Sequence, residues 1–487
     1  MHIDIIRDVL LQFYDQIIYF SFLALGLGLF QNIIYFAQIP LALLELQKIR
    51  LRKKEDNSWS MIKSDIVLPI SIIIPAHNEE LTVCENVMSL LSTQYPAFEV
   101  IAVNDGSADN TLKVLIDKFE LYKSNRFYED KLAHKNIRGI YASSLYPKLI
   151  VIDKENGGRA DAVNAGINLA RNPLFCTIDA DSILDPAALL SSVQPFIEEP
   201  ERMMATGGTV RIINGSVTEE GIIKKVQLST KILPLFQVIE YIRAFLMGRL
   251  AWSRMGMVTI ISGAFGIFKR DIVVDIGGFN TKAMGEDFEM VVKIHRYCCE
   301  SKIDYELRFV PEPVCWTEVP EDMASLKSQR VRWQQGALEV LFGNICMLGN
   351  PTYGRIGVLA FPQMFIIDAI GPIVEFLSYL LLPFFYFTGL LNVEFLIVFL
   401  SMFFVFGIFL SVMSLVLEEM SLRRFMSTKD LFIMGFVAIA ENFGYRQLNS
   451  WWRIVGWWRF ITRCKIWGDM VRVGSSESAS ATKNSRS

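Results

Sequence analysis

Two aspartates follow a short apolar segment in the middle of the sequence, where "CTIDADS" at 176–182 contains Asp179 and Asp181. An ionised carboxylate outside water costs several kcal/mol unless a cation or hydrogen bonds compensate it. This spacing suits Mg²⁺ or Mn²⁺, because such hard cations take one or two carboxylates together with substrate phosphates. The pair is therefore a candidate metal site. The alternative is that both carboxylates only cap the following helix.

Other acidic residues follow neighbouring apolar segments. In "VNDGSADNT" at 103–111, Asp105 is placed to accept a hydrogen bond from a nucleobase or ribose, unless the segment is a plain β-turn. In "PAHNEE" at 75–80, Glu79 comes after an earlier apolar segment. Ligands of open α/β sheets bind beyond the C-terminal ends of the strands. Both residues are therefore predicted to face one crevice and to bind a nucleotide donor.

The segment "DKENGGRADAVNAG" at 153–166 adds two cations, Lys154 and Arg159. An ammonium and a guanidinium beside the same crevice suit contacts with phosphate or nucleotide. The alternative is a solvated basic face. We include both in the predicted donor-binding set.

The motif "GEDF" at 285–288 places Asp287 before a predicted helix at 286–298. One interpretation is a general base. The other is that Glu286 and Asp287 only stabilise the positive end of the helix dipole.

The motif "QRVRW" at 329–333 places Gln329, Arg332 and Trp333 at helical positions i, i+3 and i+4. If the segment is helical, one face presents an amide, a guanidinium and an indole, which together suit a diphosphate and a sugar. The alternative is an amphipathic interfacial helix with a snorkelling arginine.

The elements that position these residues alternate between short apolar runs and helical patterns from about 66 to 330. This alternation predicts βαβ units and a mostly parallel sheet. Strands are expected in the five apolar runs "VLPISIIIP", "FEVIAVND", "PKLIVID", "PLFCTID" and "MMATGGTV". Helices are expected at 79–93, 109–122, 158–171 and 186–198.

Composition narrows the function further. The chain has 487 residues, 52% of them hydrophobic, and a net charge of −3, so no basic field indicates nucleic-acid binding. The seven cysteines form no CxxC pair and no Cys/His cluster, which argues against a zinc site or a disulfide framework. With four histidines in the chain, a metal is expected on carboxylates.

The N-terminal region predicts a membrane anchor. Residues 16–46 carry no charge before Glu45, and about 20 apolar residues are enough to span a bilayer. We therefore predict a transmembrane helix within 1–46 and a basic cytoplasmic linker at 47–65. By the positive-inside rule, the basic cluster at 48–54 puts the 66–330 domain in the cytoplasm.

The last third is predicted to return to the membrane. Interfacial helices are expected at 232–254 and across 331–365, and transmembrane and interfacial helices across 366–473. Within that last region, 366–390 and 393–417 are predicted spans, and 431–450 is a short span or a re-entrant or interfacial helix. The Ser-rich tail at 474–487 is predicted to be disordered.

In order, "NDGS", "DAD", "GED" and "QRVRW" resemble the motifs of membrane-embedded, processive family 2 glycosyltransferases, the group of cellulose, chitin, hyaluronan and poly-N-acetylglucosamine synthases. The resemblance implies a Rossmann-like α/β catalytic domain of the GT-A type. It also implies that Asp105 binds the nucleotide, that Asp179 and Asp181 bind metal and diphosphate, and that Asp287 is the base. Gln329, Arg332 and Trp333 resemble the element that binds donor diphosphate and acceptor sugar.

The resemblance implies an inverting, metal-dependent enzyme that transfers sugar from a UDP-sugar to a growing β-linked polysaccharide and guides the product across the plasma (inner) membrane. The implied partners are the UDP-sugar, the polysaccharide, membrane lipid and an accessory export subunit. One departure stands out, because many synthases have Thr where this chain has Gly285. The alternatives are a lipid glycosyltransferase of the ceramide type that makes a single transfer, and a membrane transporter or scaffold.

Overall fold

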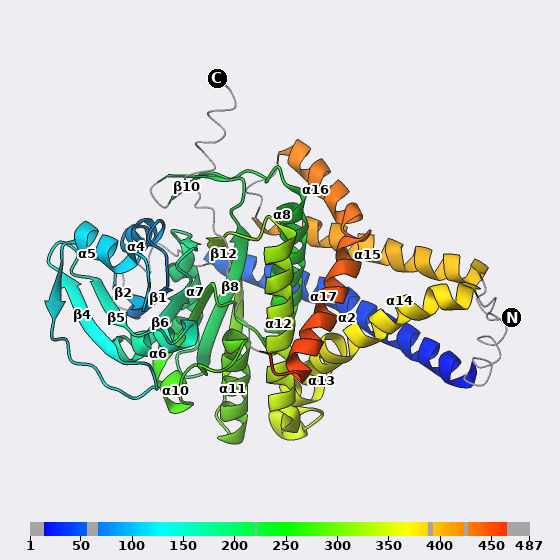
Figure 1. Cartoon of the computed structure of the whole chain (residues 1–487), viewed down its shortest axis with the longest axis horizontal. Coiled ribbons are helices and arrows are strands. Elements are labelled where there is room, and N and C mark those ends of the chain that lie inside the picture. Colours follow the sequence, from blue (N-terminus) through cyan, green and yellow to red (C-terminus); the bar gives the residue numbers. More distant parts are fainter. Residues whose placement is uncertain (1–13, 56–66, 220–221, 388–392, 423–426, 465–487) are drawn as a thin grey trace.

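The computed structural model describes residues 14–55, 67–219, 222–387, 393–422 and 427–464. The predicted disordered tail and the second half of the predicted linker lie outside these ranges. Figure 1 shows an α/β domain at one side and a group of long helices that projects at the other.

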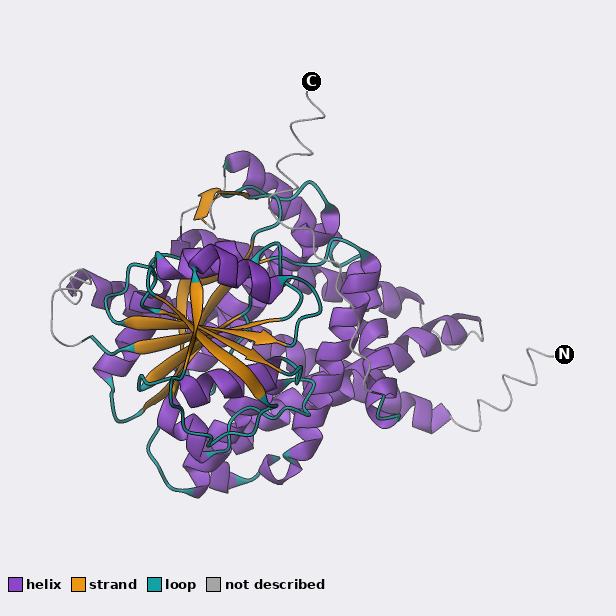
Figure 2. Ribbon diagram, turned by 60° about the vertical axis from the view of Figure 1, so that its left-hand side comes forward, coloured by secondary structure: helices purple, strands orange, loops and turns teal. Residues whose placement is uncertain are grey.

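A ten-stranded sheet forms the centre of the α/β domain, and Figure 2 shows its strands fanned by the twist of the sheet. Its strands, in spatial order, are β3 (Leu121–Ser124), β4 (Ile137–Ser143), β5 (Leu149–Lys154), β2 (Phe98–Asp105), β1 (Ile70–Ala76), β6 (Leu174–Ile178), β11 (Phe265–Lys269), β8 (Met203–Ile212), β12 (Glu306–Thr317) and β7 (Ile183–Leu184). A separate pair is formed by β9 (Val217–Glu219) and β10 (Ile222–Lys225).

The sheet is mixed, so the prediction of a mostly parallel sheet is wrong. The run β5-β2-β1-β6 is parallel, and so is the pair β8–β12. The pairs β3–β4, β4–β5, β6–β11, β11–β8 and β12–β7 are antiparallel. The five predicted strands are all present. The prediction is wrong because it does not include the strands at 137–143, 265–269 and 306–317.

Helices cover the sheet where the sequence predicts them. The helices of this domain are α4 (Val83–Leu91), α5 (Thr111–Phe119), α6 (Arg159–Leu169), α7 (Ala188–Glu198), α10 (Arg270–Asp275) and α11 (Glu286–Glu300). Because the central strands are covered on both faces, they are near-continuous apolar runs, and Ile72, Ile73 and Ile74 of β1 are all fully buried. This core holds the strand ends that carry the predicted site residues.

The segment 232–254 is one continuous helical rod of α8 (Ile232–Tyr241), the π-helical η1 (Ile242–Arg249) and α9 (Leu250–Arg254). Its side chains Leu246, Met247 and Leu250 are fully buried and join the core cluster of the sheet. The apolar face that predicted an interfacial helix is therefore covered by protein in this structure.

The long N-terminal helix α2 (Tyr14–Glu55) packs its C-terminal half against this rod. Its buried residues follow the helical repeat i, i+1, i+4, i+7 and i+8, and they are Gln38, Ile39, Ala42, Glu45 and Leu46. An ion pair of 3.0 Å between Glu45 and Arg254 of α9 lies at the end of this contact. The helix continues past residue 46, so the first half of the predicted linker is helical.

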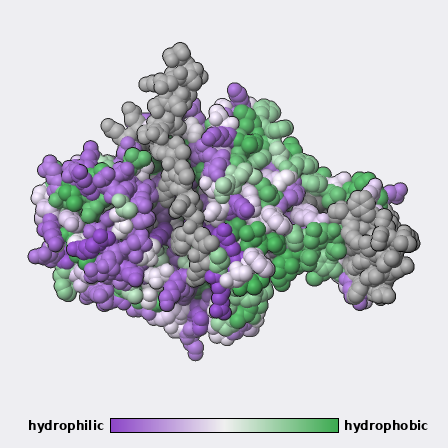
Figure 3. Space-filling view, in the orientation of Figure 1, coloured by the Kyte–Doolittle hydropathy of each residue, from purple (hydrophilic) through white to green (hydrophobic). Residues whose placement is uncertain are grey.

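The remaining helices form the projecting group. They are α12 (Met323–Gly343), η2 (Ile345–Met347), η3 (Pro351–Tyr353), η4 (Ile356–Ala360), α13 (Phe361–Met364), η5 (Phe365–Ile370), α14 (Gly371–Phe387), α15 (Val393–Leu422), α16 (Thr428–Ala440) and α17 (Tyr445–Ile461). Figure 3 shows hydrophobic surface over the part where α2, α14 and α15 project. Among the described residues, Tyr19–Leu51 and Ile356–Leu381 are the two helical stretches that qualify as long and apolar enough to cross a membrane. The predicted span at 393–417 lies within α15.

The segment 431–450 does not form a single span. Helix α16 has 13 residues, roughly 20 Å at 1.5 Å per residue, against a hydrocarbon core of about 30 Å. A turn then leads into α17, and the fully buried Glu441 in that turn lies 2.7 Å from Arg243 of η1. Ser411 of α15 donates a hydrogen bond of 2.5 Å to the same carboxylate. The polar residues that interrupt this apolar segment thus tie the turn to two other helices.

Candidate functional site

A cavity of about 1020 Å³ opens between the sheet, the rod 232–254, α11 and α12. Seven predicted site residues line it: Arg159, Asp179, Asp181, Asp287, Gln329, Arg332 and Trp333. These residues come from positions up to 174 apart in the chain. The fold therefore brings together motifs that are far apart in the sequence.

Glu79, Asp105 and Lys154 are not part of that cavity wall, and Asp105 and Lys154 form a buried ion pair behind it. The Lys154 ammonium lies 2.5 Å from Asp105 and 2.5 Å from Asp161, and the Lys154 side chain is fully buried. Asp105 also accepts hydrogen bonds from the backbone N–H groups of Gly157 and Gly158, at 3.0 and 2.7 Å. Lys154 therefore compensates two carboxylates and fixes the loop 155–158 against the end of β2.

The glycine of "NDGS" allows this loop to come close. Gly106 has a φ of +63°, and a Cβ there would lie 2.5 Å from the backbone nitrogen of Asn156. Only glycine fits such a left-handed, crowded position without strain. Gly106 thus allows the loop 155–158 to pack against Asp105.

Glu79 lies in the loop after β1, beside the start of α5. Its backbone N–H donates to the Thr111 hydroxyl at 2.8 Å, and its carboxylate accepts from the Thr82 hydroxyl at 2.9 Å. These contacts hold the loop that precedes α4 next to the turn that contains Asp105.

Arg159, the first residue of α6, reaches into the cavity and joins three segments. Its Nε lies 2.7 Å from Asp179, its Nη1 lies 3.3 Å from Glu286, and its Nη2 donates to the Gly263 carbonyl at 2.5 Å. The predicted phosphate ligand is thus paired with carboxylates here, and it connects the end of β6 to the start of α11.

Asp181 lies where a negative charge is unfavourable, because it is buried and close to other carboxylates. Burial raises its pKa to about 7, and the negative charges of Asp179 and Glu318 add to the shift. Burial likewise raises the pKa of Glu318 to about 7. A cation between Asp179 and Asp181 would relieve this repulsion, and carboxylate oxygens are the ligands that hard divalent ions prefer. The donor set therefore fits Mg²⁺ or Mn²⁺.

The described part of the chain contains no group of three or more His, Cys, Asp or Glu side chains arranged to hold a metal ion. A cation on the aspartate pair needs further oxygen ligands from substrate or water, which is usual for Mg²⁺ with a diphosphate.

Asp287 is held at the N-terminus of α11, facing the cavity. Its Oδ2 accepts from the Gly263 N–H at 3.2 Å, and its Oδ1 accepts from the Phe288 N–H at 2.8 Å. Gly263 is also the carbonyl partner of Arg159, so one peptide segment positions both side chains. The carboxylate is oriented by backbone groups and is not paired with a cation at ion-pair distance within the described residues.

The "QRVRW" motif is helical, as predicted, and lies in the middle of α12. The Gln329 side-chain oxygen is buried and has no hydrogen-bond partner among the residues the structure describes. Trp333 is 43% exposed, and the Arg330 guanidinium lies 4.6 Å from the centroid of its ring. Arg330 itself pairs with Glu240 of α8 at 2.5 Å. This arrangement presents the indole to the cavity and holds it from behind by a cation–π contact.

The departure at Gly285 has a steric cause. A Cβ on Gly336 of α12 would lie 2.9 Å from the Gly285 nitrogen, and one on Gly285 would lie 3.2 Å from the Gly336 Cα. The two backbones touch where α11 begins, two residues before Asp287. Glycine at both positions therefore sets the distance between the carboxylate of Asp287 and the face of α12 that carries Trp333.

Several residues of the cavity wall were missed by the sequence-based prediction, among them Glu240, Arg249 and Glu318. Glu318 directly follows β12 and would have been found by the strand-end argument if that strand had been recognised. Glu240 and Arg249 lie in a helix whose charges looked like those of an interfacial surface, so no local signal marked them.

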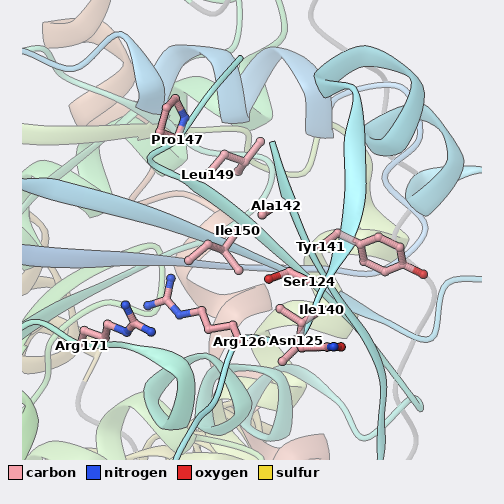
Figure 4. Close-up of a pocket in the computed structure, with 10 residues that line it drawn as sticks. All are labelled: Ser124, Asn125, Arg126, Ile140, Tyr141, Ala142, Pro147, Leu149, Ile150 and Arg171. Atoms are coloured by element: carbon pink, nitrogen blue, oxygen red, sulfur yellow. The ribbon is translucent and has the colours of Figure 1, made fainter. Parts of the chain in front are cut away.

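A second hollow of about 410 Å³ lies at the other side of the sheet, near β3, β4 and the start of β5. Figure 4 shows Arg126 and Arg171 side by side at its rim. Arg126 is paired with Glu99 at 2.9 Å, and no predicted site residue lines this hollow. It is not a candidate for the chemistry described above.

Comparison with known proteins shows the family of the chain. The family model "Glycosyl transferase family 2" matches residues 71–273, and "Glycosyl transferase family group 2" matches residues 174–417. The chain belongs to the family 2 glycosyltransferases, and with this membership the mixed sheet confirms a GT-A type of α/β domain.

Within that family the chain is similar to the poly-beta-1,6-N-acetyl-D-glucosamine synthases. It is 30% identical to the enzyme of Staphylococcus epidermidis over 335 residues, which are 68% of this chain and 70% of that one. It is 30% identical to the enzyme of Staphylococcus aureus (strain COL) over 317 residues, which are 64% of each chain.

Two solved structures are similar to the chain at low sequence identity. The mannosyltransferase PcManGT of Pyrobaculum calidifontis, in complex with GDP-Man and Mn²⁺, is 16% identical with a TM-score of 0.48 and covers 89% of this chain and 99% of its own. TarS 1-349 of S. aureus is 14% identical with a TM-score of 0.40 and covers 83% of this chain and 94% of its own. Neither likeness carries an argument about the site.

The glycine contact yields a direct test. Gly336→Ala is expected to push α12 away from the start of α11 and to lower turnover roughly ten- to hundredfold, because a shift of about 1 Å at a reacting group can cost about 10²-fold. Gly343→Ala in the same helix is the matched control, since a Cβ there meets nothing within 4 Å. Glycosyl transfer is measured for both variants beside their melting temperatures. Equal activity of the two variants would contradict the assigned spacing role.

Proposed function

We propose that this glycosyltransferase transfers a sugar from a UDP-sugar to a growing β-linked polysaccharide, with inversion at the anomeric carbon and with a divalent cation. The observation that carries the proposal is the single cavity that contains the Asp179–Asp181 pair, Asp287 and the Gln329, Arg332 and Trp333 element together. Because the relatives are named for poly-beta-1,6-N-acetyl-D-glucosamine synthesis, UDP-N-acetylglucosamine is the first donor to test.

In this proposal the donor lies across the strand ends. Asp179 and Asp181 hold Mg²⁺ or Mn²⁺, which when bound neutralises charge on the diphosphate leaving group. Asp105, fixed by Lys154 and two backbone N–H groups, forms the floor of the nucleotide site. Arg332 supplies a guanidinium from α12 for the departing diphosphate, which develops charge during the reaction.

Asp287 acts as the general base. Its carboxylate takes the proton of the acceptor hydroxyl, and this oxygen forms a bond to the anomeric carbon of the donor. The bond between that carbon and the diphosphate oxygen breaks, and UDP leaves with the electron pair. Attack opposite the leaving group converts an α-linked donor into a β-linkage. Proton transfer to such a base typically contributes about 10²–10⁴-fold.

Trp333 positions the acceptor. Its exposed indole offers an apolar face to a pyranose ring, and Arg330 keeps the ring from turning away. The buried and unpartnered oxygen of Gln329 lies one helical turn earlier and accepts a hydrogen bond from a sugar hydroxyl in this proposal.

The helical stretches Tyr19–Leu51 and Ile356–Leu381 cross the membrane in this proposal, with the α/β domain on the cytoplasmic side where nucleotide sugars are made. The polymer leaves between these helices, in contact with lipid or with an accessory export subunit.

Asp287→Asn tests the proposal directly. The amide has the shape of the carboxylate but cannot accept the proton, so turnover is expected to fall by about 10²-fold or more while UDP binds as in the wild type. Turnover is measured as UDP release from UDP-N-acetylglucosamine, and UDP affinity by calorimetry. A variant that works near the wild-type rate would move the base to another residue.

The cation is tested by removal. EDTA is expected to abolish polymer formation, and added Mg²⁺ or Mn²⁺ to restore it, because the closely spaced carboxylates of Asp179 and Asp181 leave the diphosphate charge uncompensated without an ion. Asp181→Asn should then fail to respond to restored ion. Full turnover in metal-free buffer would exclude this assignment.

The acceptor platform is tested at Trp333. Trp333→Ala is expected to abolish polymer formation while UDP binding stays intact, and some donor hydrolysis persists because water needs no aromatic platform. Trp333→Phe is the matched variant, since an anchor in the membrane interface tolerates another aromatic residue. Polymer yield and UDP release are measured on the same preparations. Normal polymer yield from Trp333→Ala would leave an anchoring role only.

A further inference from the structure

Arg249, the last residue of the π-helical η1, lines the cavity without an acidic partner. Its Nη1 is shielded from solvent and has no hydrogen-bond partner, and no described residue forms an ion pair with it. Its guanidinium stacks 3.8 Å from the centroid of the Phe245 ring. Of the other arginines on this wall, Arg243 of the rod is paired with Glu441 and Arg330 of α12 with Glu240. Arg249 is thus a cation without a counter-charge of its own.

Arg249 and Asp287 both line this cavity. Burial lowers its pKa to about 10, and the negative charge of Asp287 opposes that shift, so the guanidinium stays charged at neutral pH and feels the carboxylate of Asp287. The two side chains nevertheless make no direct ion pair in the described structure.

Gln38 provides a hydrogen-bond acceptor on the wall of the same cavity. It is 3% exposed, although it belongs to an apolar helical stretch long enough to cross a membrane, and it lines the same cavity. Its Oε1 has no hydrogen-bond partner among the described residues and would lie 3.8 Å from a Cβ on Gly248, the neighbour of Arg249. A polar side chain in such a helix that faces a cavity is a functional candidate by default.

We propose that Arg249 and Gln38 form a binding subsite for the acceptor saccharide, in which Arg249 Nη1 donates to a sugar oxygen and Gln38 Oε1 accepts from a sugar hydroxyl or amide N–H. This inference rests on the proposed function and extends it. A phosphate or carboxylate would use the guanidinium, but it would require the Gln38 amide to turn its NH2 group towards the anion. A neutral saccharide carries both donors and acceptors and satisfies both atoms.

The local backbone agrees with a binding role. π-helical segments are rare and occur frequently at functional sites, and the η1 stretch ends at Arg249. A partly buried cation whose Nη1 is shielded and that forms no ion pair with a described residue is also costly to keep for packing alone, and proteins retain such groups where function needs them. Both arguments favour a residue that is satisfied by a ligand and not by the fold.

The test uses the full chain in detergent micelles with UDP-N-acetylglucosamine and a soluble β-1,6-linked N-acetylglucosamine oligosaccharide as acceptor. Arg249→Met and Gln38→Leu keep the side-chain size and remove the polar atoms. Each variant is expected to raise the acceptor KM roughly tenfold or more, while UDP affinity stays within about twofold. Arg249→Lys should recover part of the loss. Calorimetry with the oligosaccharide alone should show the same weakening without any turnover.

Melting temperatures separate binding from structure. Arg249→Met should melt no lower than the wild type, because a partly buried charge that forms no ion pair with a described residue is removed. Gln237→Leu is the matched control for Gln38→Leu: its oxygen is also buried and unpartnered among described residues, but it does not line the cavity. It should leave the acceptor KM unchanged.

Three results would overturn the inference: a wild-type acceptor KM in Arg249→Met, weakened UDP binding with an unchanged acceptor KM, or a lowered melting temperature that fully accounts for lost activity. A wild-type enzyme that releases no UDP from any UDP-sugar and binds no oligosaccharide would instead overturn the proposed function together with this subsite. Wild-type turnover with an unaffected Arg249→Met would overturn the subsite alone.

Discussion

The site depends on the compensation of carboxylates that converge at one edge of the sheet. Two cations from one short segment do most of this work: Lys154 lies between Asp105 and Asp161, and Arg159 joins Asp179 to Glu286. Removing one partner of a buried ion pair typically costs about 3–5 kcal/mol, since the other charge is left unpaired. The segment 154–159 thus fixes the ends of β2, β5 and β6 and the start of α11 relative to one another. Asp181 and Glu318 lie at the same edge, where burial and neighbouring negative charges raise the pKa of both carboxyl groups to about 7.

The helical part of the molecule is attached to this edge by similar means. The C-terminal half of α2 packs along the rod 232–254 through a repeating buried face, and the Glu45–Arg254 pair ends that contact. The buried carboxylate of Glu441 joins the rod to α15 and to the turn before α17. Ion pairs as well as apolar contacts therefore fix the positions of these helices relative to the α/β domain. A cavity wall shared between the domain and α2 is the result.

Much of the fold was predictable from the sequence. Buried parallel strands have sequences that are continuous apolar runs, and the helices between them show apolar residues at a 3.6-residue repeat. The strand ends then located Asp105, Asp179 and Asp181, and helical spacing located the face of α12. Strand direction was not predictable in this way. The five residues of β11 and the bulged β12 have the same local pattern in either direction, and tertiary pairing decides it. The ion pairs could not be predicted from the sequence either. Buried acids compensate the charge of Lys154, whereas Arg249 forms no ion pair with a described residue, and no local sequence feature distinguishes the two.

The contact between Gly285 and Gly336 has a consequence for the history of such a chain. Neither glycine is held by a left-handed backbone, so each is fixed only by the other, 51 positions away. A side chain gained at one of them meets backbone atoms at the other, which cannot retract as a flexible side chain would. A chain with threonine at position 285 would therefore have to seat the helix of the Gln-x-x-Arg-Trp motif differently. A lineage moving between the two arrangements would have to re-seat that whole helix and pass through intermediates with a misaligned acceptor face, which isolates the two arrangements from each other.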